Sequence, residues 1–141
     1  MLSKTVEYAL RAAVWLAQCP GTAFSAQAIA QSTAVPRRYL HRVLQDLVKA
    51  GLVASQPGPR GGYWLQKPSD EVTVLDIVNA VEPLQRIRRC PLNRSEQTTL
   101  CPLHRELDKV YEYLEAAFSR VTLADLVSRA RASPPLCTKS G

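Results

Sequence analysis

The chain has 141 residues, enough for one domain with a substantial core, and 46% are hydrophobic while only 6% are aromatic, which favours a helical protein packed on aliphatic side chains. No apolar run reaches the roughly 18 residues that a membrane span needs, so we expect no membrane association. The formal net charge of +6 lies wholly in residues 1–68, where eight Lys/Arg face two acidic residues, because residues 69–141 hold ten of each sign. A basic half is typical of proteins that bind nucleic acid, although a merely solvated basic surface is the alternative.

The first predicted helix covers residues 5–17, where apolar residues recur at helical spacing before Pro20 and Gly21. Glu7 and Arg11 interrupt the apolar run, and only residues 12–17 are continuously apolar, which is too short for a signal peptide. We therefore expect a cytoplasmic protein.

A helix-turn-helix followed by a hairpin is predicted next. Ser25 suits the N-cap of a short helix over 26–32, and Pro36 suits the first position of a longer helix over 36–50. Two helices joined by about three residues, the second basic on its outer side, are typical of helix-turn-helix domains. Two β-prone runs flank the Pro/Gly-rich turn 57–62, which predicts a hairpin and so a winged helix.

The remaining chain is predicted to be helical. Thr73 and Asp76 form a capping-box pattern at the start of one helix, and Thr122 caps a last short helix. Between them, a long helix over 102–119 carries apolar residues at heptad spacing (Leu103, Leu107, Val110, Leu114, Ala117 and Val121). Such a helix packs either on its own domain or on a second copy, and we expect a homodimer.

We therefore predict a mostly α fold with a small β-hairpin, built as a winged helix-turn-helix domain plus a long dimerisation helix. The predicted division is a DNA-binding domain over 1–82, a sensor loop with cysteines over 83–101, and the dimerisation and closing helices over 102–131. A disordered tail is predicted over 132–141.

The start of the 36–50 helix carries the residues predicted to bind DNA. Arginine pairs with guanine edges or phosphate, and a tyrosine hydroxyl commonly meets phosphate. An arginine at the tip of the Gly-rich turn is placed to enter a minor groove or hold a phosphate. The predicted DNA-binding residues are Pro36, Arg37, Arg38, Tyr39, His41, Arg42 and Arg60. Ordinary surface arginines, and for the glycines a purely turn-forming role, are the alternatives.

Two of the four cysteines sit near a histidine. Cys101 precedes Pro102, so it is expected at a helix N-cap, where backbone N–H groups favour thiolate, and His104 lies three residues on. Cys90 follows three arginines that also favour thiolate. Cys19 and Cys137 are interpreted as a small buried residue and a thiol in a disordered tail.

The segment IAQSTAVPRRYLHRVLQDLVKAGLVASQPGPRGGYWL, the later VLDIVNAVE and the closing TLADL together resemble the Rrf-type winged-helix transcription regulators (IscR/NsrR-like) over about residues 1–127. The resemblance implies a dimer formed through the long helix and binding to palindromic double-stranded DNA operators. It also implies sensing of iron–sulfur status, nitric oxide or redox state through a cluster held by the cysteine loop. Pro36, Arg38, Tyr39 and Arg42 match DNA-facing positions of the family.

The chain departs from the family in two places. Pro57 stands where many members have a wing arginine, and Arg60 is expected to substitute for it. Cluster-binding members usually carry three loop cysteines, and this chain has only the first and last. Cys101 and His104 match a spacing seen in one group of members, and Glu7 matches a carboxylate ligand, in some cases from the partner subunit.

Four interpretations of this site therefore stay open. A [2Fe–2S] cluster needs four ligands, and Cys90, Cys101, His104 and Glu7 of the same or a partner chain are the candidates. A thiol–disulfide switch between the cysteines, zinc or another metal, and no sensing role are the others. The expected function is a regulator, most simply a dimeric repressor, whose DNA binding responds to this site.

Two other classes of protein fit this sequence less well. A small redox enzyme or cluster carrier lacks support because the sequence has no Cys-x-x-Cys motif, Gly-rich nucleotide loop or catalytic constellation. A winged helix that binds only protein partners would favour an acidic or neutral recognition helix, and this one is basic. We therefore expect no enzyme activity.

Overall fold

The structure is a computed structural model that describes residues 2–90 and 100–131. The predicted disordered tail, with Cys137, lies outside the described residues. In chain order the elements are α1 (Lys4–Gln18), α2 (Ala26–Thr33), α3 (Arg37–Lys49), β1 (Val53–Gln56), β2 (Gly62–Leu65), the 3-10 turn η1 (Ser69–Glu71), α4 (Val74–Val81), α5 (Pro102–Ser119) and α6 (Leu123–Arg131). The predicted mostly helical fold with one small hairpin is confirmed. None of the described helices is long and apolar enough to cross a membrane.

The helix-turn-helix forms as predicted. The Ser25 hydroxyl accepts the Ala28 N–H at the start of α2. Pro36, predicted at the first position of the next helix, is instead the N-cap of α3, which begins at Arg37. Between the two helices Ala34 adopts a left-handed conformation (φ 55°), which turns the chain sharply. The buried Thr33 hydroxyl donates to the Ile29 carbonyl, and among the described residues no buried side-chain nitrogen or oxygen is left without a hydrogen-bond partner.

The wing is a two-stranded antiparallel hairpin in which Val53 faces Leu65 and Gln56 faces Gly62. Gly62 has φ 140°, and a Cβ there would lie 2.5 Å from the Phe24 carbonyl oxygen. This close approach lets Phe24 and Tyr63 exchange backbone hydrogen bonds of 3.0 and 2.8 Å. Glycine is therefore required where the wing is fastened to the segment before α2.

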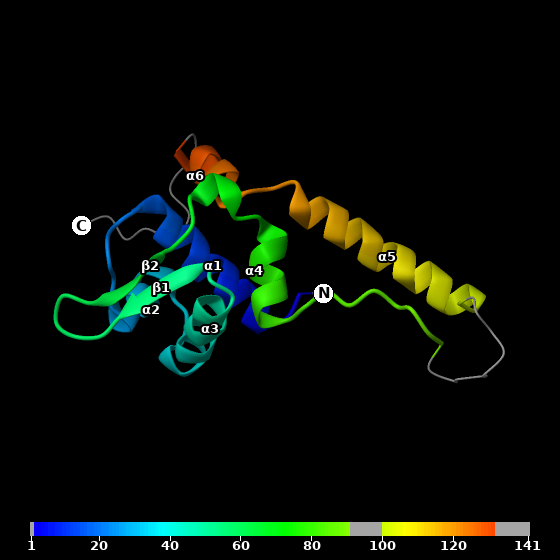
Figure 1. Cartoon of the computed structure of the whole chain (residues 1–141), viewed down its shortest axis with the longest axis horizontal. Coiled ribbons are helices and arrows are strands. Elements are labelled where there is room, and N and C mark those ends of the chain that lie inside the picture. The colour runs from blue at the N-terminus through cyan, green and yellow to red at the C-terminus, as the bar shows by residue number, and fades with distance from the viewer. Residues whose placement is uncertain (1, 91–99, 132–141) are drawn as a thin grey trace.

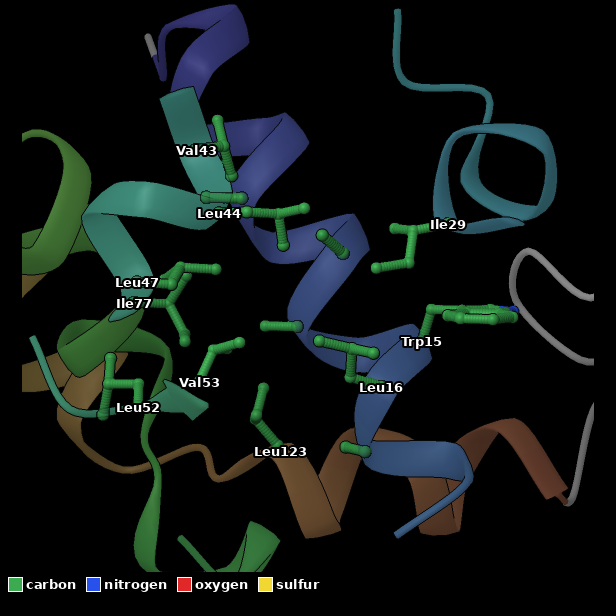
Figure 2. Packing of buried hydrophobic residues seen from close by; sticks show 14 of the residues in the cluster. Trp15, Leu16, Ile29, Val43, Leu44, Leu47, Leu52, Val53, Ile77 and Leu123 are labelled. Atoms are coloured by element: carbon green, nitrogen blue, oxygen red, sulfur yellow. The ribbon is translucent and has the colours of Figure 1, made fainter. Parts of the chain in front are cut away.

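One main core holds the globular body together. Figure 2 shows side chains of α1, α2, α3, β1, α4 and α6 converging, among them Leu16, Leu44, Leu47, Ile77 and Leu123. Each of these five side chains is at most 1% exposed. The α6 helix therefore closes the core of the same globular body that carries α3.

A second, smaller cluster joins α1, α4, the end of α5 and α6. Val6, Val74 and Val78 are buried there, with Phe118 and Leu126 packed against them. The backbones also pair, because the Val74 N–H donates to the Val121 carbonyl and the Leu123 N–H to the Val72 carbonyl. From this junction α5 extends away from the globular body (Figure 1).

Two capping boxes fix the starts of α4 and α6. At α4 the Thr73 hydroxyl accepts the Asp76 N–H and the Asp76 carboxylate accepts the Thr73 N–H. Thr122 and Asp125 repeat the pattern at α6. The Thr122 backbone N–H, and then its hydroxyl, lower the pKa of Asp125. Both predicted caps are confirmed.

The interpretation of Cys19 as a buried residue is wrong. Cys19 is the C-cap of α1 and is exposed. The chain leaves α1 toward Pro20 and Gly21 at this point, so the side chain falls outside the packed stripe of the helix.

Candidate nucleic-acid interface and metal site

The α3 helix has an apolar face that is buried in the core and a basic face that is exposed. On the core face, each of four side chains is at most 1% exposed: Leu40, Val43, Leu44 and Leu47. Arg37, Arg38, Tyr39, His41 and Arg42 are all exposed, as are Pro36 before them and Arg60 at the wing tip. Within the described residues no acidic group forms an ion pair with any of these arginines. Their charges are therefore available to an external anion.

Two residues on the outer face of α3 are held in a stack that reaches α1. The Arg38 guanidinium lies over the Tyr39 ring at 4.7 Å from its centroid and donates to the Tyr39 hydroxyl at 3.1 Å. The Tyr39 ring also meets the Tyr8 ring of α1, with centroids 5.5 Å apart and the ring planes tilted by 41°. Arg11 lies 5.7 Å from the Tyr8 ring centroid and also donates to the Thr33 carbonyl at the end of α2. The α1 helix thus supports both ends of the turn into α3.

At the far end of α5, three predicted ligands come together. The Sγ atoms of Cys90 and Cys101 lie 3.9 Å apart, and His104 Nδ1 lies 3.5 Å from the first and 2.9 Å from the second. All three side chains are half-buried. Two thiols and an imidazole at these distances are suited to binding one soft metal or to thiol chemistry.

Cys101 is the N-cap of α5, as predicted, with Pro102 beginning the helix. Its sulfur forms no full capping hydrogen bond, but the His104 backbone N–H is near enough to favour the thiolate. That N–H, and then the His104 side chain, lower the pKa of Cys101 to about 7. A helix N-terminus therefore makes this thiol the more reactive kind of cysteine.

Cys90 arrives at this point on an extended segment, residues 82–90, which we call the strap. The strap leaves α4 and runs toward the start of α5 (Figure 1). Halfway along, Arg86 binds Asp108 of α5 through two hydrogen bonds of 2.8 Å each, and the Ile87 N–H donates to the same carboxylate at 2.9 Å. The Arg86 guanidinium, and then the Ile87 N–H, hold the pKa of Asp108 low, at about 2.

Glu7 is not brought to the three ligands within the described chain, because the group around Cys90 contains Cys90, Cys101 and His104 only. Glu7 lies on α1 with its side chain 57% exposed and pairs with Arg11 at 2.7 Å. Its participation therefore requires a second copy of the chain.

The chemical types of these three ligands suit an iron–sulfur cluster, but a cluster needs one ligand more than the three present. Two thiolates with an imidazole are established cluster and zinc ligands, and both kinds of site take four protein ligands when closed. The described residues of one chain supply three. An open coordination position or a ligand from another chain would complete either site.

Four residues of these two surfaces were not predicted from the sequence: Tyr8, Arg11, Arg86 and Asp108. Tyr8 and Arg11 look like ordinary residues of an amphipathic helix, and Arg86 precedes its partner by 22 positions. No local spacing rule connects positions this far apart, so a sequence signal is absent for the pair.

An exposed basic recognition helix, a hairpin wing and a gathered Cys/His site define a DNA-binding regulator of the winged-helix class. The chain matches the model of the Rrf2 family, described as iron-dependent transcriptional regulators, over residues 2–129. It therefore belongs to the Rrf2 family of transcriptional regulators, which are not enzymes.

Individual relatives agree with this assignment. An Aquifex aeolicus protein whose name is that of an HTH-type transcriptional regulator is 30% identical over 132 residues, covering 91% of this chain and 92% of that protein. Among solved structures, CymR, the global cysteine regulator of B. subtilis, is 30% identical with a TM-score of 0.73, covering 92% of this chain and 97% of that one. The T. potens IscR structure is 27% identical with a TM-score of 0.78, covering 100% and 93%.

Proposed function

We propose that this regulator acts as a homodimer on a palindromic operator, most simply as a repressor in the cytoplasm, and that its DNA binding responds to the Cys90, Cys101 and His104 site. The observation that carries the proposal is the close gathering of these three ligand atoms at the end of a helix that leaves the DNA-binding body. A change of state there alters the anchoring of α5 and so the spacing of two recognition helices.

The dimer proposal is supported by the free face of α5. At 100° per residue, Leu103, Leu107 and Val110 share one side of the helix. Asp108, which binds the strap, lies about 100–160° around the helix from them and so faces away from that side. The three apolar side chains are 63%, 43% and 56% exposed. A heptad stripe left open along a helix is suited to pairing with a second copy.

The DNA-binding proposal assigns base or phosphate contacts to Pro36, Arg37, Arg38, Tyr39, His41, Arg42 and, from the wing, Arg60. Exposure and the lack of competing ion pairs support it. We expect Arg42→Ala and Arg60→Ala each to weaken binding about tenfold in mobility-shift assays on an operator obtained by in vitro selection. Lys49→Ala, at the opposite end of α3, is the matched control and should retain affinity. Unchanged affinity in both arginine variants would contradict the assignment of Arg42 and Arg60 to DNA binding.

Salt dependence provides a second test of the same interface. Contacts to phosphate release counterions, so affinity for random-sequence duplex should fall steeply with salt concentration. If Arg42 holds a phosphate, its loss should reduce the slope of log K against log salt by about one. A flat slope for the intact protein would point to a winged helix that binds protein partners.

For the sensor site, we propose that the occupant is a [2Fe–2S] cluster held by Cys90, Cys101 and His104, with Glu7 of a second copy as the fourth ligand. The exposure of Glu7 and the three converging donors support this ligand set. A bound cluster would supply sensitivity to iron supply and to oxidants. Glu7 would then have to leave Arg11, the residue that contacts both Tyr8 and the Thr33 carbonyl beside α3.

A thiol–disulfide switch is the second candidate, and the 3.9 Å between the two sulfurs favours it. A disulfide requires about 2 Å, so small side-chain rotations bring the sulfurs into bonding range. This switch needs neither a fourth ligand nor a metal.

One experiment separates the candidates. The protein is purified without oxygen, and its iron, acid-labile sulfide and zinc are measured together with a visible spectrum. Matched iron and sulfide that are lost in Cys101→Ser and reduced in Glu7→Gln would support the cluster and its fourth ligand. If the protein is colourless and iron-free and forms a Cys90–Cys101 disulfide on oxidation, the cluster proposal is rejected and the thiol–disulfide switch is supported.

A further inference from the structure

We propose that Arg86 and Asp108 are positioning residues that hold Cys90 against Cys101 and His104, which deepens the sensor function proposed above and rests on it. Arg86 of the strap binds Asp108 of α5 one helical turn beyond His104, and we call this contact the clamp. Without this clamp, the first of the three ligands has no fixed place beside the other two.

The clamp is built on a single carboxylate that receives three hydrogen bonds. Both terminal oxygens of Asp108 accept from Arg86, and one of them also accepts the Ile87 backbone N–H. Glu112, one turn further along α5, adds an ion pair to Arg86 at 3.7 Å. A two-pronged guanidinium contact fixes direction as well as distance, so the strap is oriented and not merely attracted.

The clamp is partly shielded from water. The Arg86 and Asp108 side chains are 31% and 17% exposed, whereas those of the Lys109–Glu106 pair on the same helix are 55% and 69% exposed. Exposed pairs contribute little because solvent screens them and both side chains lose freedom. The clamp is therefore expected to matter more than its neighbour, which makes Glu106 a suitable control.

The position of Cys90 depends on this clamp. Near α4 the strap is held by Leu84, whose N–H donates to the Asn79 side chain and whose side chain joins the second hydrophobic cluster. Five residues then separate Leu84 from Cys90. Within that stretch Arg86 and Ile87 contact α5 at Asp108, and Arg86 also contacts Glu112. Holding a reacting group close to its partner raises its effective concentration, and loosening the strap lowers it.

The first test measures the Cys90–Cys101 disulfide equilibrium, which needs no metal. In a full-length chain carrying Cys19→Ser and Cys137→Ser, the two thiols are oxidised by glutathione disulfide. Each turnover forms one Cys90–Cys101 bond, breaks one glutathione disulfide bond and releases two glutathione thiols. We expect Asp108→Asn to lower this equilibrium constant about tenfold, which is about 30 mV in potential. Arg86→Lys keeps the charge but loses the two-pronged contact, and it should fall between Asp108→Asn and the parent.

The second test uses Co²⁺ as a probe of the reduced site. Binding is followed by visible absorption, in which thiolate ligands give a distinct spectrum. Asp108→Asn should weaken Co²⁺ binding about tenfold, and Glu106→Gln, the matched charge change on α5, should leave both measurements at parent values. Circular dichroism checks that each variant keeps its helices, so a loss confined to potential and metal affinity reports positioning.

The outcomes separate this proposal from the sensor function. A parent-like potential and Co²⁺ affinity in Asp108→Asn would overturn the clamp. Equal losses in Asp108→Asn and Glu106→Gln would also overturn it, because the effect would then be general to α5 charge. If the clamp variants behave as expected but DNA binding of the parent ignores both oxidation and metal, the clamp stands and the sensor function fails.

Discussion

Single residues at the two functional surfaces are set by their local environment more than by their type. Cys101 and Cys19 are both at helix ends, yet one is an N-cap beside an imidazole and the other a C-cap. A helix N-terminus favours a thiolate and a C-terminus does not. Tyr39 similarly differs from a surface tyrosine without neighbours, because the Tyr8 ring and the Arg38 guanidinium both contact its ring.

The lowered pKa of Cys101 gives a pH dependence that can be measured. Below pH 7 the thiol is protonated and reacts slowly, and above pH 7 the thiolate dominates. In metal-free protein that carries Cys19→Ser and Cys137→Ser and keeps Cys90, iodoacetamide modification of Cys101, followed by mass spectrometry of its peptide, should reach half its maximal rate near pH 7. His104→Ala should move that midpoint upward, and a midpoint already at about 8.5 in the parent would contradict this environment.

Tyr8 provides a prediction about the recognition helix. Tyr8→Ala should weaken operator binding about three- to tenfold, because Tyr39 and Arg38 lose the ring that fixes them. Tyr8→Phe keeps the ring and should bind as the parent does. Both variants are measured by mobility shift at a temperature where circular dichroism shows full folding. Equal affinity of the alanine and phenylalanine variants would mean that the stack does not contribute.

At the scale of elements, most boundaries follow from local chemistry. The predicted helix over 102–119 matches α5, and the Ser25, Thr73 and Thr122 caps lie where the sequence placed them. Capping and proline signals act through hydrogen bonds within three residues, so sequence alone identifies them. The left-handed Ala34 is different, because alanine carries no signal for that conformation.

The Ala34 conformation leads to a stability prediction. Ala34→Gly removes a side chain from the left-handed region and should raise the free energy of unfolding by about 0.5–1 kcal/mol. Gln31→Gly, at an exposed position of the preceding helix, should instead lower it by about 0.5–1 kcal/mol. Urea unfolding of both variants provides the comparison, and a loss of stability in Ala34→Gly would contradict the argument.

On the scale of the whole molecule, the globular body and α5 have different exposure. The body buries its apolar residues in two clusters, whereas α5 has no buried residue along its 18 positions. Yet α5 carries exposed Leu103, Leu107 and Val110 on the side away from the strap. An exposed apolar stripe of this kind is typical of a surface that meets another chain.

Disrupting this stripe should separate two copies without unfolding either. Leu107→Glu with Val110→Glu should give a monomer in sedimentation analysis, with circular dichroism unchanged because both side chains already face outward. Operator affinity should fall by at least about tenfold, since one recognition helix replaces two. Lys109→Glu introduces the same charge away from the stripe and should leave the assembly intact. A dimer that survives the double change would show that α5 is not the contact.

Residue patterns were enough to predict the winged helix, the caps and the basic face of α3, because each depends on spacing within a few residues. The residue types around Cys90, Cys101 and His104 were enough to name them as candidate ligands. The three-dimensional fold was needed to show that α6 closes the core beside α1 and that Tyr8 contacts Tyr39. The same holds for Arg86 of the strap, which binds Asp108 of α5. These contacts join residues 22 or more positions apart, beyond the reach of any local spacing rule. Burial of apolar surface, which has no direction along the chain, closes the core at α6, whereas a two-pronged ionic contact joins Arg86 to Asp108.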